Sequence, residues 1–180
     1  MKMAYFLEVG VGTEVDIIQA VKYHKAAAEA GDEDALCNYG ICLLSGNGVE
    51  WNPEAAVELF KIASSARYTE AFMRLGECYE TGWGVQQDHD EAFRLYNEAA
   101  EKGEIGAYAK VGRCLVFGRG VAEDQEEGMW YLQTAVDYGD RTAFNILGNL
   151  YRNGYGVEKR REKHSYVTNV LCVPDIGPRI

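Results

Sequence analysis

The sequence contains little proline and no long hydrophobic run. Its 180 residues include only three prolines, so long stretches can remain helical. No segment reaches the ~18 consecutive apolar residues of a membrane-spanning helix. The first residues lack the apolar core and cleavage site of a secretory signal, and Glu8 interrupts them. We therefore expect neither a membrane span nor a signal peptide.

Basic residues are also scarce. The chain has 18 Lys and Arg against 28 Asp and Glu, which gives a net charge of -10 and an isoelectric point near 4.8. A surface of this sign repels a phosphate backbone, so we expect no nucleic-acid partner. Hydrophobic residues make up 47% of the chain, which is typical of a globular protein rather than a disordered one.

The dominant feature of the sequence is a gapless 36-residue repeat. We call residues that stand 36 apart a column. One column holds Ala35, Ala71, Ala107 and Ala143, and a second, five positions later, holds Gly40, Gly76, Gly112 and Gly148. We divide the chain into an incomplete first unit (1–34), three full units (35–70, 71–106 and 107–142), and a last unit with a C-terminal cap (143–180). A repeat of this length predicts a solenoid.

Each unit has the pattern of two helices. Apolar residues recur at helical spacing, and Gly-x-Gly-Val separates the two helical stretches. Gly82 stands where a left-handed C-terminal cap would fall. Asp88 with Glu91, three residues later, predicts a capping box at the start of the second helix, and Asp124 with Glu127 repeats it. A single helix pair cannot bury its apolar face, so we expect the pairs to stack.

The pattern Ala-x4-Gly-x2-Tyr/Leu-x2-Gly-x-Gly-Val-x2-Asp-x3-Ala resembles the Sel1-like repeat, a relative of the tetratricopeptide repeat. The resemblance covers about residues 4–172. It implies an all-α, right-handed α/α superhelix that holds proteins together. The chain departs from the pattern at Arg67, which replaces the glycine that closes the second helix elsewhere. In the last unit, Arg160 and His164 occupy the N-cap and alanine columns, and its second helix is expected near residues 161–172.

We find no signature of catalysis, of a metal site or of a cofactor. A phosphate-binding Gly-rich loop needs a preceding strand, whereas a helix precedes each glycine pair here. The three histidines occupy different columns, and no CxxC or Cys/His grouping suggests zinc. The carboxylates gather at helix starts, where they offset the macrodipole. The sequence therefore predicts a protein that is not an enzyme.

The five cysteines have the wrong spacing for disulfides. Cys42, Cys78 and Cys114 share a column, and solenoid units stack at least ~8–10 Å apart, beyond disulfide reach. Cysteine-rich Sel1-like proteins pair one cysteine from each helix of a unit, which this chain does not imitate. We expect buried, reduced thiols and a cytoplasmic location.

The resemblance also implies that the first helix of each unit lines a concave groove. The columns two, six, nine and ten positions after the opening alanine vary in residue type and are expected to face it. The candidate groove residues are Ile41, Leu44, Met73, Glu77, Glu80, Arg113, Val116, Phe117, Asn145, Asn149, Arg152 and Asn153. In the alternative, Val116 and Phe117 pack against the adjacent helix.

The expected function is that of a non-catalytic adaptor or scaffold that binds a peptide or protein segment in this groove. Two alternatives stay open: a β-lactam-binding or β-lactamase-like protein, as implied by the cysteine-rich relatives, and a secreted effector of a pathogen or symbiont.

Overall fold

The computed structural model describes residues 16–155, which form eight helices and, within that range, no strand. In chain order the helices are α2 (Ile17–Glu29), α3 (Glu33–Ser45), α4 (Pro53–Ser65), α5 (Thr69–Thr81), α6 (His89–Glu101), α7 (Ile105–Phe117), α8 (Gln125–Asp137) and α9 (Arg141–Arg152). The expectations for Arg160, His164, Cys172 and the helix near 161–172 lie outside the described residues, as do residues 1–15 of the first unit.

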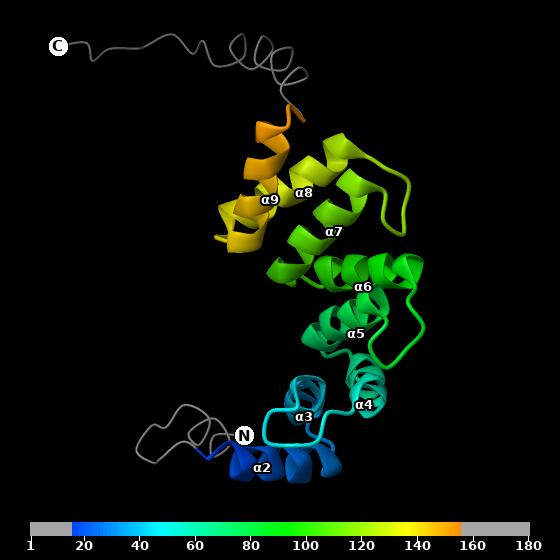
Figure 1. Ribbon diagram of the computed structural model, residues 1–180, viewed down its shortest axis with the longest axis vertical. Helices are drawn as coiled ribbons and strands as arrows, with labels where there is room; N and C mark the ends of the chain where they lie inside the picture. Colours follow the sequence, from blue (N-terminus) through cyan, green and yellow to red (C-terminus); the bar gives the residue numbers. More distant parts are fainter. Residues whose placement is uncertain (1–15, 156–180) are drawn as a thin grey trace, which may run out of the picture.

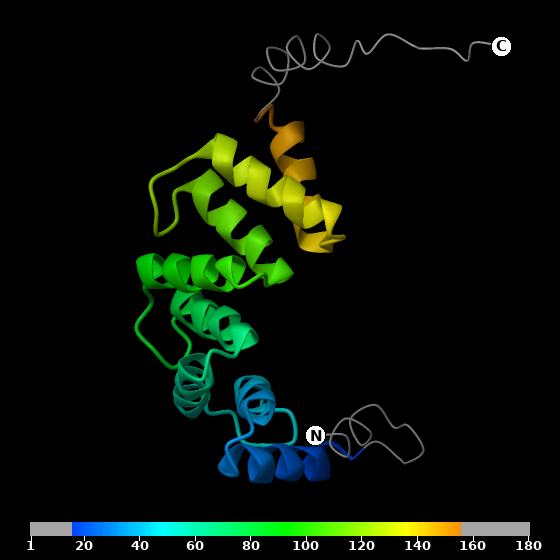
Figure 2. The same cartoon turned by 180° about the vertical axis from the view of Figure 1, so that it is seen from behind.

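The helices stack into one curved array. Each helix packs against its neighbours in chain order, from α2 against α3 to α8 against α9. In Figure 1 the array runs from α2 at one end to α9 at the other, with α4 and α6 on its bulging side. Figure 2 shows the same bend from behind. Stacking buries the apolar stripes that a single helix pair would leave in water. The prediction of an all-α solenoid is confirmed.

The first helix of each complete unit ends at a left-handed glycine. Gly46, Gly82 and Gly118 have φ of 68°, 79° and 62°, and the N–H of each donates to a cysteine carbonyl one turn earlier. A left-handed backbone is strained for residues with a Cβ, so glycine fits this position. The prediction of a C-terminal cap at Gly82 is confirmed.

The second helices begin with a side-chain cap. The side chains of Asp16, Asn52, Asp88 and Asp124 accept hydrogen bonds from backbone N–H groups in the first helical turn.

The capping boxes predicted at Asp88 and Asp124 are only half correct. The backbone N–H groups of these two residues donate to the carbonyl oxygens of Tyr79 and Leu115, both at 2.9 Å, rather than to a glutamate side chain. Glu91 instead binds the guanidinium of Arg94. The first helix of the same unit thus satisfies the donor that a capping box would use.

A glycine sits where the two helices of a unit cross. An added Cβ at Gly76 would lie 2.6 Å from Cε1 of Tyr96, and one at Gly40 would lie 2.5 Å from Cε1 of Phe60. Tyr96 and Phe60 are fully buried. In these two units the glycine lets a large ring of the second helix pack directly on the first helix. At Gly112 the neighbours are instead the Gly128 carbonyl oxygen and Leu132.

The Gly-x-Gly loops at 46–48, 82–84 and 118–120 also touch the preceding unit. The second glycine of the pair has a positive φ and lies against the first residue of the earlier second helix. An added Cβ would lie 2.2 Å from the Pro53 carbonyl oxygen at Gly84, and 1.8 Å from that of His89 at Gly120. These backbone contacts fix how one unit sits on the next.

The four described cysteines are buried and carry no disulfide. Burial raises the pKa of Cys37 to about 12 and the pKa values of Cys78 and Cys114 to about 11. Burial of an uncharged thiol disfavours the thiolate, so these side chains act as small apolar groups. The expectation that this column is buried is confirmed.

Candidate binding surface

The candidate groove residues lie on the first helices of successive units. They come from α3, α5, α7 and α9, except that Asn153 caps the end of α9. The structure divides them into partly buried apolar side chains, a set of paired charges, exposed side chains toward α9, and one fully buried residue, Val116.

The apolar candidates on α3 and α5 are not freely exposed. Ile41, Leu44 and Met73 are partly buried and pack against the main hydrophobic core. Each presents only part of its surface to the outside. They can contribute apolar area beside a bound partner, but they also belong to the core.

The charged candidates on α5 and α7 bind one another. Lys110 Nζ lies 2.9 Å from Glu77 Oε1 and 3.7 Å from Glu80 Oε2. Arg113 forms a further ion pair with Glu80. The hydroxyl of Tyr96, from α6, donates to Glu80 at 2.9 Å. Three helices of two units therefore meet at the Glu80 carboxylate.

The surroundings of Glu80 favour its charged form. Partial burial opposes ionisation, but Arg113, the Tyr96 hydroxyl and Lys110 outweigh it and lower the pKa of this carboxyl. The Lys110 ammonium also lies 5.4 Å from the centroid of the Tyr96 ring. The network leaves little unpaired charge for a partner to bind.

Sequence reasoning missed two members of this network, Lys110 and Tyr96. Lys110 stands three residues before Arg113, a spacing that places both side chains on one helix face, and this signal could have been used. Tyr96 could not be found in this way because it belongs to a second helix and its ring is fully buried.

Val116 and Phe117 behave differently from each other. Val116 is only 3% exposed and packs in a core cluster with residues of α8 and α9. The prediction that Val116 faces outward is wrong, because its side chain points at the glycine of α8, Gly128, which leaves room for it. Phe117 is 50% exposed, although it occupies the last turn of the same helix.

The α9 candidates are open to solvent. Asn145, Asn149, Arg152 and Asn153 are all exposed. Among residues 16–155, no hydrogen bond or ion pair engages their side chains. The side-chain amides and the guanidinium are thus available donors and acceptors.

Comparison with known families decides what kind of protein this is. The model of the Sel1 repeat matches residues 1–32, 33–68, 69–104, 105–140 and 145–163. The chain belongs to the Sel1 repeat family. Sel1 repeats generally form protein-interaction scaffolds rather than enzymes. The family model counts each complete unit from two residues before the opening alanine used above.

Solved structures of Sel1 repeat proteins are similar to this chain. A Sel1 repeat protein from Oxalobacter formigenes shares 32% sequence identity over 87% of this chain and 64% of its own, with a TM-score of 0.77. A protective antigen of uropathogenic Escherichia coli with an SLR fold shares 30% identity over 87% of this chain and 34% of its own, also with a TM-score of 0.77. This Sel1 chain therefore spans less than two thirds of either protein.

A more distant likeness is confined to the fold. Cysteine-rich protein B of Helicobacter pylori shares 20% identity over 73% of this chain and 95% of its own, with a TM-score of 0.56. No curated protein matches the chain. Within residues 16–155, no helix has the length and apolar character needed to cross a membrane.

Proposed function

We propose that this Sel1 repeat protein is a non-catalytic scaffold that binds a segment of another protein along its first helices. The segment would lie over the end formed by α7 and α9, with Phe117 as its apolar anchor. Amide side chains of α9 would bind the partner's backbone.

The half-exposed ring of Phe117 is the observation that carries this proposal. Its column otherwise holds Ser45, Thr81 and Asn153, so the fold does not require a large apolar side chain there. Phe117 follows Arg113 by one helical turn and therefore lies on the same face of α7 as the paired charges. Aromatic side chains that are partly exposed beside polar groups are typical anchors of protein interfaces.

The charge network supports placing the anchor at this end. Glu77, Glu80, Lys110 and Arg113 already form ion pairs with one another, so a partner would have to break ion pairs to bind them. Asn149 and Asn153 have no such competitors among the described residues, and an amide both donates and accepts hydrogen bonds. A partner backbone would find unpaired groups on α9 and an apolar contact on α7.

The two alternatives from the sequence lack a supporting observation. The described cysteines all lie on first helices and are unbridged, unlike the one-per-helix pairing implied for cysteine-rich relatives. Nothing in the described residues favours a secreted effector over a cytoplasmic adaptor, and the cytoplasmic location stays a prediction.

Site-specific crosslinking tests the proposal. A photo-crosslinking phenylalanine analogue is placed at Phe117 in the protein expressed in its native host, and covalent adducts are identified by mass spectrometry. Trp130 is the matched control, because it is an aromatic residue of α8 that is 60% exposed. We expect a discrete protein adduct at 117 that is absent at 130.

Affinity for the captured partner then gives the magnitude. Phe117→Glu should weaken binding by about 30-fold or more, the loss of roughly 2 kcal/mol expected when an interface anchor is removed. Trp130→Glu should leave affinity unchanged. Equal adducts at both positions, or a Phe117→Glu variant that unfolds, would show that Phe117 is not an anchor.

A further inference from the structure

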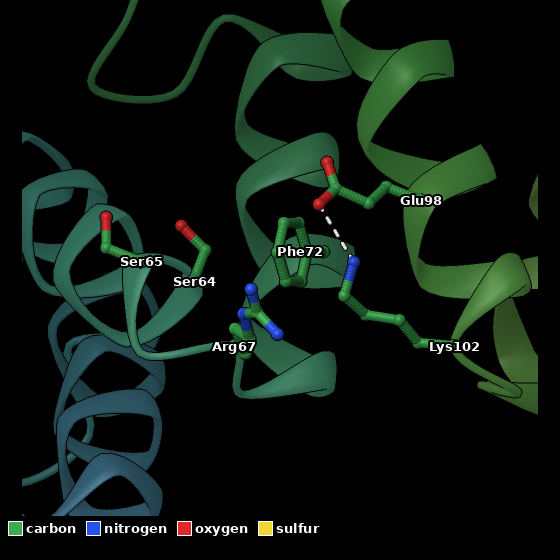
Figure 3. A pocket seen from close by; sticks show the side chains of 6 residues that line it. All are labelled: Ser64, Ser65, Arg67, Phe72, Glu98 and Lys102. Atoms are coloured by element: carbon green, nitrogen blue, oxygen red, sulfur yellow. Dashed lines mark hydrogen bonds and ion pairs between the residues drawn. The ribbon is translucent and has the colours of Figure 1, made fainter.

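A polar pocket lies between the turn after α4 and the C-terminal end of α6, with Phe72 of α5 between them. Its volume is about 550 Å³, and it is lined by Ser64, Ser65, Arg67, Phe72, Glu98 and Lys102. Figure 3 shows the Arg67 guanidinium extending toward Phe72, with Ser64 on one side and the ion pair between Lys102 and Glu98 on the other.

Arg67 adopts a backbone conformation that normally requires glycine. Its φ is 67°, and it is the one residue other than glycine with a positive φ in the described part of the chain. The same column holds Gly31, Gly103 and Gly139, with φ of 85–86°. A side chain is sterically possible at these glycines, because a Cβ added to any of them would meet no atom within 4 Å. Arginine thus stands at a position where it strains the backbone without being needed by the fold.

The Arg67 guanidinium has no structural partner. Within residues 16–155, no hydrogen bond or ion pair engages it. Nor is it needed to cap α4. The carbonyl oxygens of Ile62, Ala63 and Ser64 already accept from the backbone N–H groups that follow the helix. The usual structural reason for a cation after a helix C-terminus is therefore weak here.

The whole turn differs in charge from its counterparts. The turn from 65 to 68 reads Ser-Ala-Arg-Tyr, whereas the equivalent turns read Glu-Ala-Gly-Asp (29–32), Glu-Lys-Gly-Glu (101–104) and Asp-Tyr-Gly-Asp (137–140). Counting side-chain charges gives +1 for the first and -2, -1 and -2 for the others. Compared with the equivalent turns, the turn at 65–68 has two fewer acidic residues, and it has an arginine in place of the glycine. This basic turn borders the pocket in a protein whose net charge is -10.

The side of the pocket opposite Arg67 holds a second cation, Lys102. Its counter-ion, Glu98, also pairs with Arg94. Lys102 Nζ lies 2.8 Å from Glu98 Oε1 and 4.5 Å from the centroid of the Phe72 ring. The other oxygen of Glu98 binds Arg94 at 3.2 Å. With Glu98 held by two cations, the pocket keeps a net positive charge.

We propose that this pocket binds a carboxylate group of an acidic peptide segment, with the Arg67 guanidinium as its principal donor and the Lys102 ammonium as the second. A guanidinium can donate two parallel hydrogen bonds to a planar carboxylate. The hydroxyls of Ser64 and Ser65 now donate to the Lys61 carbonyl, so their oxygens line the pocket mainly as small polar groups. The site is separate from the surface around Phe117 and does not depend on it.

A carboxylate fits this donor set better than a phosphate does. Phosphate sites usually combine several cations with backbone N–H groups at a helix N-terminus. This pocket adjoins the C-terminal ends of α4 and α6, and the first turn of α5 contributes Phe72, an apolar side chain, to its lining. Carbonyl dipoles at those ends disfavour a dianion more than a single negative charge. One free guanidinium beside an apolar ring matches a single planar carboxylate.

Nuclear magnetic resonance titration of the complete chain tests the inference. The reporters are the Nε–H resonance of Arg67 and the backbone amides of Ser64 and Lys102. The probes are an end-blocked Asp-Glu-Asp-Glu tetrapeptide, its Asn-Gln-Asn-Gln analogue, succinate and inorganic phosphate. We expect saturable shifts with carboxylate probes and none with the amide analogue. Shifts with the peptide alone indicate a peptide segment, and shifts with succinate alone indicate a small carboxylate; both support a carboxylate site.

Arg67→Gly is an unusually clean variant, because it restores the residue found in the other units. It should weaken carboxylate binding at least about tenfold, as expected for loss of a charged hydrogen bond, while raising the urea midpoint of unfolding. Arg67→Lys keeps the charge without the planar fork and should bind with intermediate affinity. Phe117→Glu should leave the titration unchanged, which separates this site from the scaffold surface.

Three results would overturn the inference. They are the absence of saturable shifts with both carboxylate probes, tighter binding of phosphate than of either carboxylate, and unchanged carboxylate binding in Arg67→Gly.

Discussion

Gly120 meets two structural requirements, a left-handed backbone and a close contact with the preceding unit, and replacing it by alanine tests both. Gly120 has a φ of +72°, and a Cβ there would lie 1.8 Å from the carbonyl oxygen of His89 in the preceding unit. Gly103 has a φ of +86°, but a Cβ there would meet nothing within 4 Å. Alanine at 103 therefore reports only the backbone strain, whereas alanine at 120 reports the strain and the contact between units.

The expected losses of stability differ by about 1–3 kcal/mol. A left-handed alanine costs about 1–2 kcal/mol, and the stiffer unfolded chain offsets about 0.4–1 kcal/mol of that. Gly103→Ala should thus lower the free energy of unfolding by about 1 kcal/mol. At Gly120 the loop must also retreat by about 1.6 Å to reach an ordinary 3.4 Å contact. Backbone shifts of this kind cost about 1–3 kcal/mol, which brings the total for Gly120→Ala to about 2–4 kcal/mol.

Urea denaturation followed by circular dichroism measures both variants. Gly84→Ala should fall near Gly120→Ala, because its Cβ would lie 2.2 Å from the Pro53 carbonyl oxygen. Since Gly120 joins neighbouring units, its variant should also broaden the transition as the array loses cooperativity. Equal losses at 103 and 120, with equally sharp transitions, would refute the idea that the loops couple the units.

Three further predictions concern the core and the charge network. Gly76→Leu should destabilise the protein by about 2 kcal/mol or more in thermal or urea unfolding, because the added side chain would overlap the buried ring of Tyr96; an unchanged transition would contradict the tight crossing. Glu80→Gln should cost about 2 kcal/mol at pH 7, because Arg113 loses its carboxylate partner and Lys110 keeps only Glu77. The pKa of Glu80 is lower in the folded protein than in the unfolded chain. The stability that the Glu80 carboxylate contributes is therefore present above the unfolded pKa of about 4.3 and is lost as the pH falls through the lowered folded pKa. The urea midpoints of the original protein and of Glu80→Gln should converge in acid, and a constant gap between them would refute the assignment. At pH 8 a thiol reagent should react slowly with the four described cysteines of the native protein, because all four are buried. After unfolding without reductant it should react with five thiols; a total of three or fewer would contradict reduced cysteines.

The fold was predictable because the sequence repeats the residues that the backbone requires. Gly82 and Gly118 recur where the chain needs a left-handed turn, and Gly76 and Gly112 recur where the second helix of the unit packs closely on the first. Such positions are fixed by local geometry or by contact within one unit. A single sequence with several units shows them as constant columns.

The candidate surface was only partly predictable, because columns that vary need not be free to bind. Glu77, Glu80 and Arg113 vary between units, yet they vary together and pair across α5 and α7. Val116 varies because Gly128 of α8 makes room for it. Only coordinates distinguish such compensated changes from side chains without an internal partner.

That distinction gives a rule for solenoid proteins of this kind. Some residues that differ from the repeat are accommodated by a second change nearby, as Val116 is by Gly128. Such a pair is explained by packing alone. A departure that costs stability and gains no internal partner needs another explanation. Arg67 meets this second condition, because it strains the backbone and its guanidinium binds nothing in the described chain. Phe117 meets it in part, because half of its ring stays in water where serine, threonine or asparagine stands in the other units. Selection for stability alone would favour glycine at 67 and a polar residue at 117. The two positions are therefore where an external ligand most directly accounts for the residue present.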